Sequence, residues 1–187
     1  MIYKIMLRIF LVILFSVFST AATAQLIVIG SGKPQACYEY AQRGNQGSIS
    51  AISTCRDALN APLTVKDEAA TLVNLGLLLM RKGDLEAAEK HYLSALDLQP
   101  ETTEIHINYG AALIMMDRDK EALSYLNKAI LLDTPKMKEA LYNRAVVYHG
   151  KEDYRSAYFD LQSILKISPG YAPALKFIET YDVKRAG

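Results

Sequence analysis

The 187-residue chain contains no tryptophan, only two cysteines and only three histidines. It has no Gly-rich phosphate-binding loop, no G-x-S-x-G nucleophile motif and no H-E-x-x-H zinc motif. The histidines, His91, His106 and His149, lie in separate segments, and no two have the spacing that gathers metal ligands on one helix face. We therefore expect no catalytic residues, no metal site and no cofactor.

Neither sign of charge is in excess, since 21 lysines and arginines stand against 20 aspartates and glutamates. Loss of Lys4 and Arg8 with an amino-terminal leader would leave 19 basic against 20 acidic residues. A near-neutral chain of mixed charge offers no broad positive surface to phosphates. We expect no binding to nucleic acid and no electrostatic binding to anionic membranes.

Long apolar runs are scarce, and the one at the amino terminus has the order of an export signal. Lys4 and Arg8 precede an apolar run over residues 9–18, and Ala22-Thr23-Ala24 follows as an A-x-A cleavage site. This order predicts a signal peptide over residues 1–24 that is cleaved after Ala24. The mature protein is then expected to be periplasmic or secreted, of the exported bacterial type.

Two membrane-attached alternatives remain for the same segment. The apolar run of about ten residues is shorter than the roughly 20 needed to span a bilayer, so an uncleaved anchor is disfavoured. A lipid anchor is also disfavoured, because Cys37 lies far from the apolar run and Pro34 stands where an aliphatic residue is needed. We expect no stable membrane insertion after signal cleavage.

The two cysteines, Cys37 and Cys55, both lie in the part of the chain that would be exported. In an oxidising compartment the default for such a pair is a disulfide. A redox or metal role would favour C-x-x-C spacing or neighbouring histidines, and neither is present. A structural disulfide is therefore the preferred interpretation.

The chain repeats itself with a period of 34 and then 35 residues. The repeated positions are Asn74-Leu75-Gly76, Asn108-Tyr109-Gly110 and Asn143-Arg144-Ala145, then Ala88, Ala122 and Ala157, and the closing prolines Pro100, Pro135 and Pro169. Apolar residues within each unit fall mostly at i, i+3 and i+4, which predicts two amphipathic helices. The small residues allow the two helices to approach closely. A single hairpin cannot bury its apolar face, so stacked copies are expected to form a solenoid.

These residues resemble the tetratricopeptide repeat, whose pattern is W-x2-L-G-x2-Y…A-x3-F…P. The three matches are Leu72-x2-Leu75-Gly76-x2-Leu79 with Ala88-x3-Tyr92 and Pro100; His106-x2-Tyr109-Gly110-x2-Leu113 with Ala122-x3-Leu126 and Pro135; and Leu141-x2-Arg144-Ala145-x2-Tyr148 with Ala157-x3-Leu161 and Pro169. The resemblance implies an all-α solenoid of antiparallel helix hairpins, with repeats over residues 69–102, 103–136 and 138–171. His106 occupies the tryptophan position, so a packing role is favoured over a ligand role.

The segments outside the repeats are expected to act as caps. Residues 36–65, which contain both cysteines, resemble a shortened and degenerate hairpin pinned by the disulfide. Residues 172–187 are expected to form a capping helix, begun by Pro173, and a tail. Residues 25–35 are expected to be a flexible segment.

In the family's geometry the first helix of each hairpin lines the concave side, which implies a peptide-binding groove. The groove residues implied here are Val73, Asn74, Leu77, Ile107, Asn108, Ala111, Ile114, Tyr142, Asn143 and Val146. The in-phase asparagines could hold a peptide backbone, although bonds within the solenoid are an equal alternative. The lysine and arginine clamp by which some family members grip a terminal carboxylate is largely missing. An amphipathic or apolar peptide is the favoured occupant, and the protein's own tail or residues 25–35 are the alternative.

The expected function is that of a non-catalytic protein-interaction module, a scaffold or adaptor of the cell envelope whose partner is a protein or peptide of unknown identity. Two other classes stay open. One is a structural subunit of an envelope or secretion assembly. The other is an undetected enzyme or ligand carrier, which would show a deep closed pocket in place of an open groove.

Overall fold

The computed structural model describes residues 32–43, 48–132 and 135–181. Within these ranges the chain forms nine α-helices and no β-strand, which confirms the all-α fold. The helices are α2 (Lys33–Gln42), α3 (Ile49–Leu59), α4 (Val65–Lys82), α5 (Leu85–Leu98), α6 (Thr103–Met115), α7 (Asp119–Leu131), α8 (Met137–Gly150), α9 (Tyr154–Ile167) and α10 (Ala172–Ile178). The signal peptide expected over residues 1–24 lies outside the described residues.

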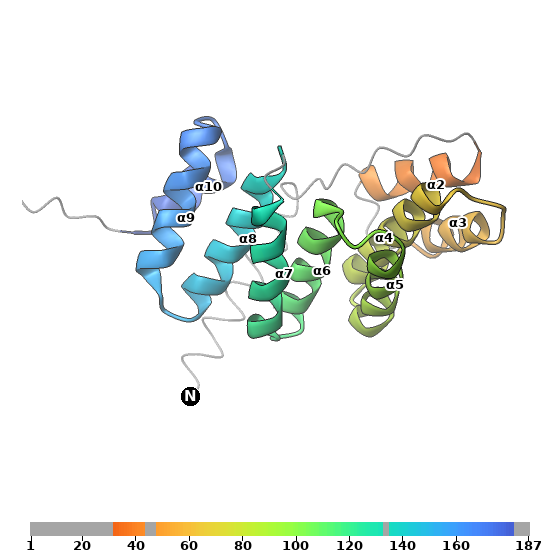
Figure 1. The fold of residues 1–187 in the computed structure, drawn as a ribbon, viewed down its shortest axis with the longest axis horizontal. Helices are drawn as coiled ribbons and strands as arrows, with labels where there is room; N and C mark the ends of the chain where they lie inside the picture. The colour runs from red at the N-terminus through yellow and green to blue at the C-terminus, as the bar shows by residue number, and fades with distance from the viewer. Residues whose placement is uncertain (1–31, 44–47, 133–134, 182–187) are drawn as a thin grey trace, which may run out of the picture.

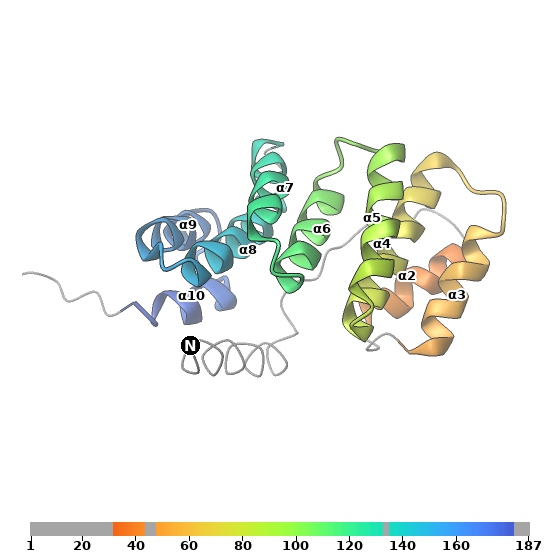
Figure 2. The same cartoon turned by 90° about the horizontal axis from the view of Figure 1, so that it is seen from below.

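Consecutive helices pair as hairpins that follow one another along the long axis of the molecule (Figure 1). The pairs are α2–α3, α4–α5, α6–α7 and α8–α9, and α10 packs against α9. Direct contacts also join the first helices in the series α2, α4, α6 and α8. The second helices of the repeats, α5, α7 and α9, do not pack against one another in the same way. The first helices therefore lie on the inner side of the stack (Figure 2).

The helix ends follow from local chemistry. Thr64 caps α4, since its Oγ1 accepts a hydrogen bond from the backbone N–H of Asp67 at 3.1 Å. Gly83 ends that helix in the left-handed region with φ 88°, and the equivalent turns of the next repeats place Asp117 and Glu152 there with φ 57° and 65°. The first helix of the first repeat starts at Val65, one turn before the boundary predicted at residue 69.

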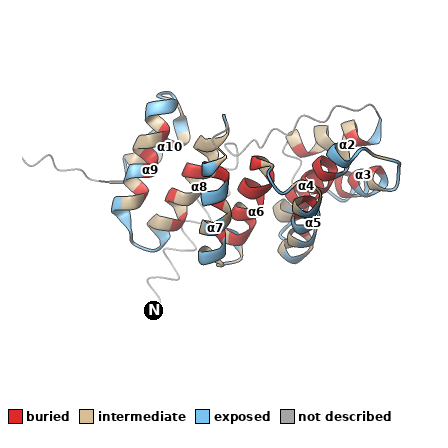
Figure 3. Cartoon of the chain, viewed as in Figure 1, coloured by how far each residue is buried: buried red, intermediate tan, exposed pale blue. Residues whose placement is uncertain are grey.

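Small residues let the two helices of a hairpin approach closely, as the repeated pattern predicted. A Cβ added at Gly76 would lie 2.8 Å from the Tyr92 ring, and one added at Gly110 would lie 2.9 Å from Leu126. Ala145 fills the equivalent place in the third repeat and is fully buried. Gly76 and Gly110 are themselves buried, and Figure 3 shows buried residues along α4 and α6.

The amino-terminal hairpin is covalently closed. A disulfide joins Cys37 on α2 to Cys55 on α3, and both side chains are fully buried. Arg81 on α4 attaches this hairpin to the first repeat by donating a hydrogen bond to the Ala41 carbonyl at 2.5 Å. Because α2 begins at Lys33, residues 33–35 are helical and do not belong to the flexible segment expected over residues 25–35.

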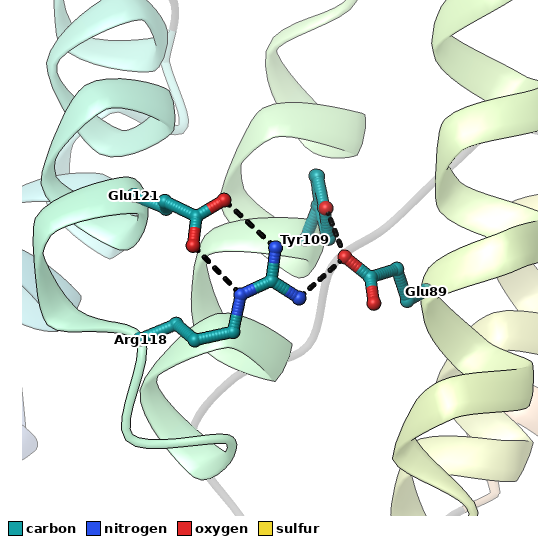
Figure 4. Close-up of polar contacts among 4 residues, drawn as sticks. All are labelled: Glu89, Tyr109, Arg118 and Glu121. Carbon is teal, nitrogen blue, oxygen red and sulfur yellow. Dashed lines mark hydrogen bonds and ion pairs between the residues drawn. The ribbon is translucent and has the colours of Figure 1, made fainter.

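A polar network joins the first repeat to the second (Figure 4). Glu89 on α5 accepts hydrogen bonds from the Tyr109 hydroxyl at 2.5 Å and from Arg118 at 2.6 Å. The same guanidinium donates two bonds to Glu121, at 2.7 and 2.8 Å. Burial raises the pKa of Tyr109, and its hydrogen bond to Glu89 raises the pKa further. The network links α5 to the second hairpin.

A more buried ion pair closes the third repeat. Arg144 on α8 donates two hydrogen bonds to the Asp160 carboxylate on α9, at 2.7 and 2.8 Å. A third bond runs from Arg144 to the Asn127 side-chain oxygen on α7 at 2.7 Å. Arg144 therefore ties both helices of its own repeat to the preceding repeat.

Candidate functional site

A pocket of about 30 Å³ opens on the inner side of the stack, between the first helices. Its lining residues come from α4, α6, α8 and the turn before α8: Leu77, Met80, Glu104, Ile107, Asn108, Ala111, Lys136, Glu139 and Asn143. A drug-sized ligand needs a pocket of roughly 300–1,000 Å³. This pocket accepts at most the end of one side chain or a water molecule, so it does not suit a carrier of small molecules.

The structure brings half of the predicted groove residues together at this pocket. Five of them line it: Leu77, Ile107, Asn108, Ala111 and Asn143. Ile107 is only 4% exposed, because it also packs against Ala129 and Ala140. Val73 and Asn74 are buried in α4, and Val73 belongs to the main hydrophobic core.

The remaining predicted groove residues are engaged elsewhere. Tyr142 packs edge-on against Tyr171 and Phe177, so the capping helix α10 and its preceding turn cover it. Ile114 packs against the main core, and Val146 is half-buried on α8. The pocket therefore takes most of its lining from the second repeat, with smaller contributions from the first and the third.

Two in-phase asparagines present amide groups without partners. The Nδ2 atoms of Asn74 and Asn108 are buried and form no hydrogen bond, and the two side chains are only 3% and 4% exposed. A buried donor without an acceptor costs about 1–3 kcal/mol. The alternative in which these amide nitrogens bond within the solenoid is not realised at these two positions.

Charged side chains form one wall of the pocket. Lys136 pairs with Glu104 at 3.4 Å, whereas the Oε2 atom of Glu139 is buried without a hydrogen-bond partner. Burial raises the pKa of Glu139, because the ionised carboxylate loses hydration. The motif spacing did not predict Lys136, because this residue lies in the turn after Pro135, outside the helical repeat pattern.

The histidines take part in packing. His106 donates a hydrogen bond from Nε2 to the Pro100 carbonyl at 2.7 Å and stacks on Tyr125, so the predicted packing role is confirmed. His149 lies against Phe177 and within 2.9 Å of the Tyr181 hydroxyl. Burial lowers the pKa of both histidines.

Over residues 32–43, 48–132 and 135–181, no group of three or more histidine, cysteine, aspartate or glutamate side chains could hold a metal ion. Within the same ranges, no helix combines the length and the apolar composition that crossing a bilayer requires.

Two sequence models of the tetratricopeptide repeat match residues 67–134 and 138–171, and together they cover more than half of the chain. The chain belongs to the tetratricopeptide-repeat family. Repeats of this family are in general non-catalytic modules for protein interaction.

Solved structures of the family have the same fold. The YrrB structure, described as having an unusual peptide-binding site, shares 24% identity and a TM-score of 0.64 over 79% of this chain and 73% of its own. MamA shares 24% identity and a TM-score of 0.62 over 77% of this chain and 81% of its own. The first repeat domain of RPAP3, bound to the HSP90 peptide SRMEEVD, shares 19% identity and a TM-score of 0.57 over 60% of this chain and 89% of its own.

Two longer relatives match about half of the chain. A BBSome complex member BBS4 homolog of Drosophila melanogaster is 28% identical over 96 residues, which are 51% of this chain. A DnaJ homolog subfamily C member 7 homolog of Schizosaccharomyces pombe is 30% identical over 98 residues, which are 50% of this chain. In both cases the match spans only 20% of the relative's length.

Proposed function

We propose that this tetratricopeptide-repeat protein binds a peptide segment of a partner protein on the inner face formed by α4, α6 and α8, and acts as a non-catalytic scaffold or adaptor. The observation that carries the proposal is the buried, unpartnered amide nitrogen of Asn108, which lines the pocket on this face. The peptide-binding descriptions of the YrrB and RPAP3 structures support the same use of the fold.

The chemistry of an asparagine amide explains how such a site works. Its nitrogen donates to a peptide carbonyl, and its oxygen accepts from a peptide N–H, whatever the side chain of the bound residue. Asn143 lines the same pocket as Asn108, so a bound strand can be contacted from α6 and α8 at once. The unfavourable burial of the free donors in the unbound protein is relieved when a peptide supplies acceptors.

The Asn108→Ala variant tests this proposal, because stability and binding are expected to move in opposite directions. Loss of a buried unpartnered donor should leave the melting temperature unchanged or raise it. Binding of heptapeptides selected by phage display on the wild-type protein should weaken about tenfold, as expected for one lost hydrogen bond to a desolvated donor. Fluorescence anisotropy measures the affinity, and thermal unfolding measures the stability.

Asn60→Ala is the matched control, since Asn60 is exposed at the end of α3, outside the groove. It should leave peptide affinity unchanged. If Asn108→Ala and Asn60→Ala bind the selected peptides equally well, the peptides do not use this face and the proposed function is refuted.

We further propose that the protein acts in the cell envelope after export. Two features support this setting: the signal-like order of residues 1–24 and the Cys37–Cys55 disulfide, a bond that persists in oxidising compartments. Amino-terminal sequencing of the protein recovered from the envelope fraction is expected to begin at Gln25. Recovery of the intact chain from the cytosol, with two free thiols, would contradict this setting.

A further inference from the structure

The pocket contains one acidic group that no neighbouring cation neutralises. Among the described residues, no lysine, arginine or histidine lies within ion-pair distance of Glu139, whereas Glu104 on the same wall is paired with Lys136. The Oε2 atom of Glu139 is buried and forms no hydrogen bond. The pocket therefore has three charged groups, of which Glu104 and Lys136 pair with each other and Glu139 has no ion-pair partner.

The nearby cations are engaged elsewhere. Lys138 extends over the Tyr171 ring, with its Nζ atom 5.6 Å from the ring centroid, and Lys136 is the partner of Glu104. Burial raises the pKa of Glu139, and the positive charges of the two lysines offset this increase only in part. A cation delivered from outside the chain would relieve the burial of this carboxylate more directly than either lysine does.

The rest of the pocket fits the remainder of a basic residue. Leu77, Met80 and Ile107 supply an apolar wall, which suits the last methylene groups of a lysine or arginine side chain. Asn108, only 4% exposed, lines the same pocket with an unpartnered Nδ2 donor that requires an acceptor such as a main-chain carbonyl. The pocket thus offers a hydrogen-bond donor to a main-chain carbonyl and, beside it, a carboxylate to a cation. A peptide with a basic side chain supplies both of the matching groups.

We propose that the pocket receives the end of a lysine or arginine side chain of the partner peptide, with its charged head paired to Glu139 and a main-chain carbonyl of the peptide bonded to Asn108. This inference rests on the proposed function and specifies the partner as a basic peptide. The pocket of about 30 Å³ admits the end of one side chain, so one basic residue at a defined position should dominate recognition. The same carboxylate repels an acidic residue at that position.

The test uses pools of acetylated and amidated heptapeptides with neutral random flanks and a fixed central residue, either arginine, lysine, norleucine or glutamate. The protein is isolated from cells that express the full chain. Arginine and lysine pools are expected to bind at least about tenfold more tightly than the norleucine pool, as for a charge-assisted bond in a desolvated site. The glutamate pool should bind more weakly than the norleucine pool.

Two variants identify the responsible carboxylate. The affinities of Glu139→Gln for the arginine and norleucine pools should agree within about twofold, because glutamine keeps the shape of the glutamate side chain but has no charge. Its melting temperature should equal or exceed that of the wild type, since an unpaired buried charge is removed. Glu86→Gln, on the exposed side of α5, makes the same chemical change outside the pocket and should retain the preference for basic pools.

The outcomes separate this inference from the proposed function. If wild-type protein binds all pools equally, and Asn108→Ala weakens them all, the groove binds peptides and the basic preference is refuted. If basic pools are preferred equally by Glu139→Gln and wild type, another acidic group is responsible and the assignment of Glu139 is refuted. If no pool binds, and the phage-selected peptides bind Asn108→Ala as tightly as the wild type, both proposals are refuted.

Discussion

Replacing Arg144 with methionine is expected to lower the free energy of unfolding of the third repeat by about 3 kcal/mol, because it leaves the Asp160 carboxylate without its partner. The Asp160 side chain is 8% exposed, and both of its oxygens accept hydrogen bonds from Arg144. The third bond of this guanidinium, to Asn127, holds the second and third repeats together. Urea unfolding followed by circular dichroism measures the loss.

Two comparisons test the cause of that loss. Arg43→Met removes an exposed ion pair with Glu39, whose side chains are 70% and 46% exposed, and should cost about 0.5 kcal/mol or less. The double variant Arg144→Met/Asp160→Leu replaces the buried pair by apolar groups and should be more stable than Arg144→Met alone. Equal losses for Arg144→Met and Arg43→Met would show that burial of Asp160 does not govern the effect.

Replacing both Cys37 and Cys55 with alanine is expected to destabilise the amino-terminal hairpin by about 3 kcal/mol. The bridge closes a loop with a sequence separation of 18, and its loss frees that loop in the unfolded chain. Alanine keeps the fully buried positions apolar, so the effect should come mainly from the missing cross-link. Hydrogen exchange read by mass spectrometry should be faster across α2 and α3.

The spatial pattern of exchange is the internal control. A solenoid transmits stability mainly between neighbouring repeats, so exchange in α8 and α9 should change little. An intermediate change in α4 is expected, because Arg81 bonds to the Ala41 carbonyl and α2 packs on α4. Uniform acceleration along the whole chain would mean that the protein unfolds as one cooperative unit.

The repeat architecture could be predicted from the sequence because its determinants are local. Helix hairpins require apolar residues at helical spacing, a turn and small residues at the crossing, and all of these lie within about 34 residues of one another. The close approaches at Gly76 and Gly110 occur where the pattern placed them. The start of α4 was predicted less accurately, because the Thr64 cap begins the helix one turn before the first position of the repeat pattern.

The candidate site could be predicted only in part, since its polar contacts depend on neighbouring repeats. The sequence placed Asn108 and Ala111 on the inner face, and they do line the pocket. It predicted a capping helix over residues 172–187 but did not single out Tyr142 as a residue that this helix covers, because that contact depends on how the last helix folds back. Nor did it indicate that Lys136, in the turn before α8, would pair with Glu104 on α6.

The sequence by itself determined the class of this protein, a stack of helix hairpins, because periodicity, small crossing residues and turn residues act within each repeat. Only the tertiary structure decided which inner-face groups are already satisfied and which are not. Whether a buried charge or amide has a partner depends on distances between side chains of different repeats, as for Glu104 with Lys136. That geometry leaves Asn108 and Glu139 unpartnered in one pocket, and the proposed recognition of a basic peptide depends on these two groups.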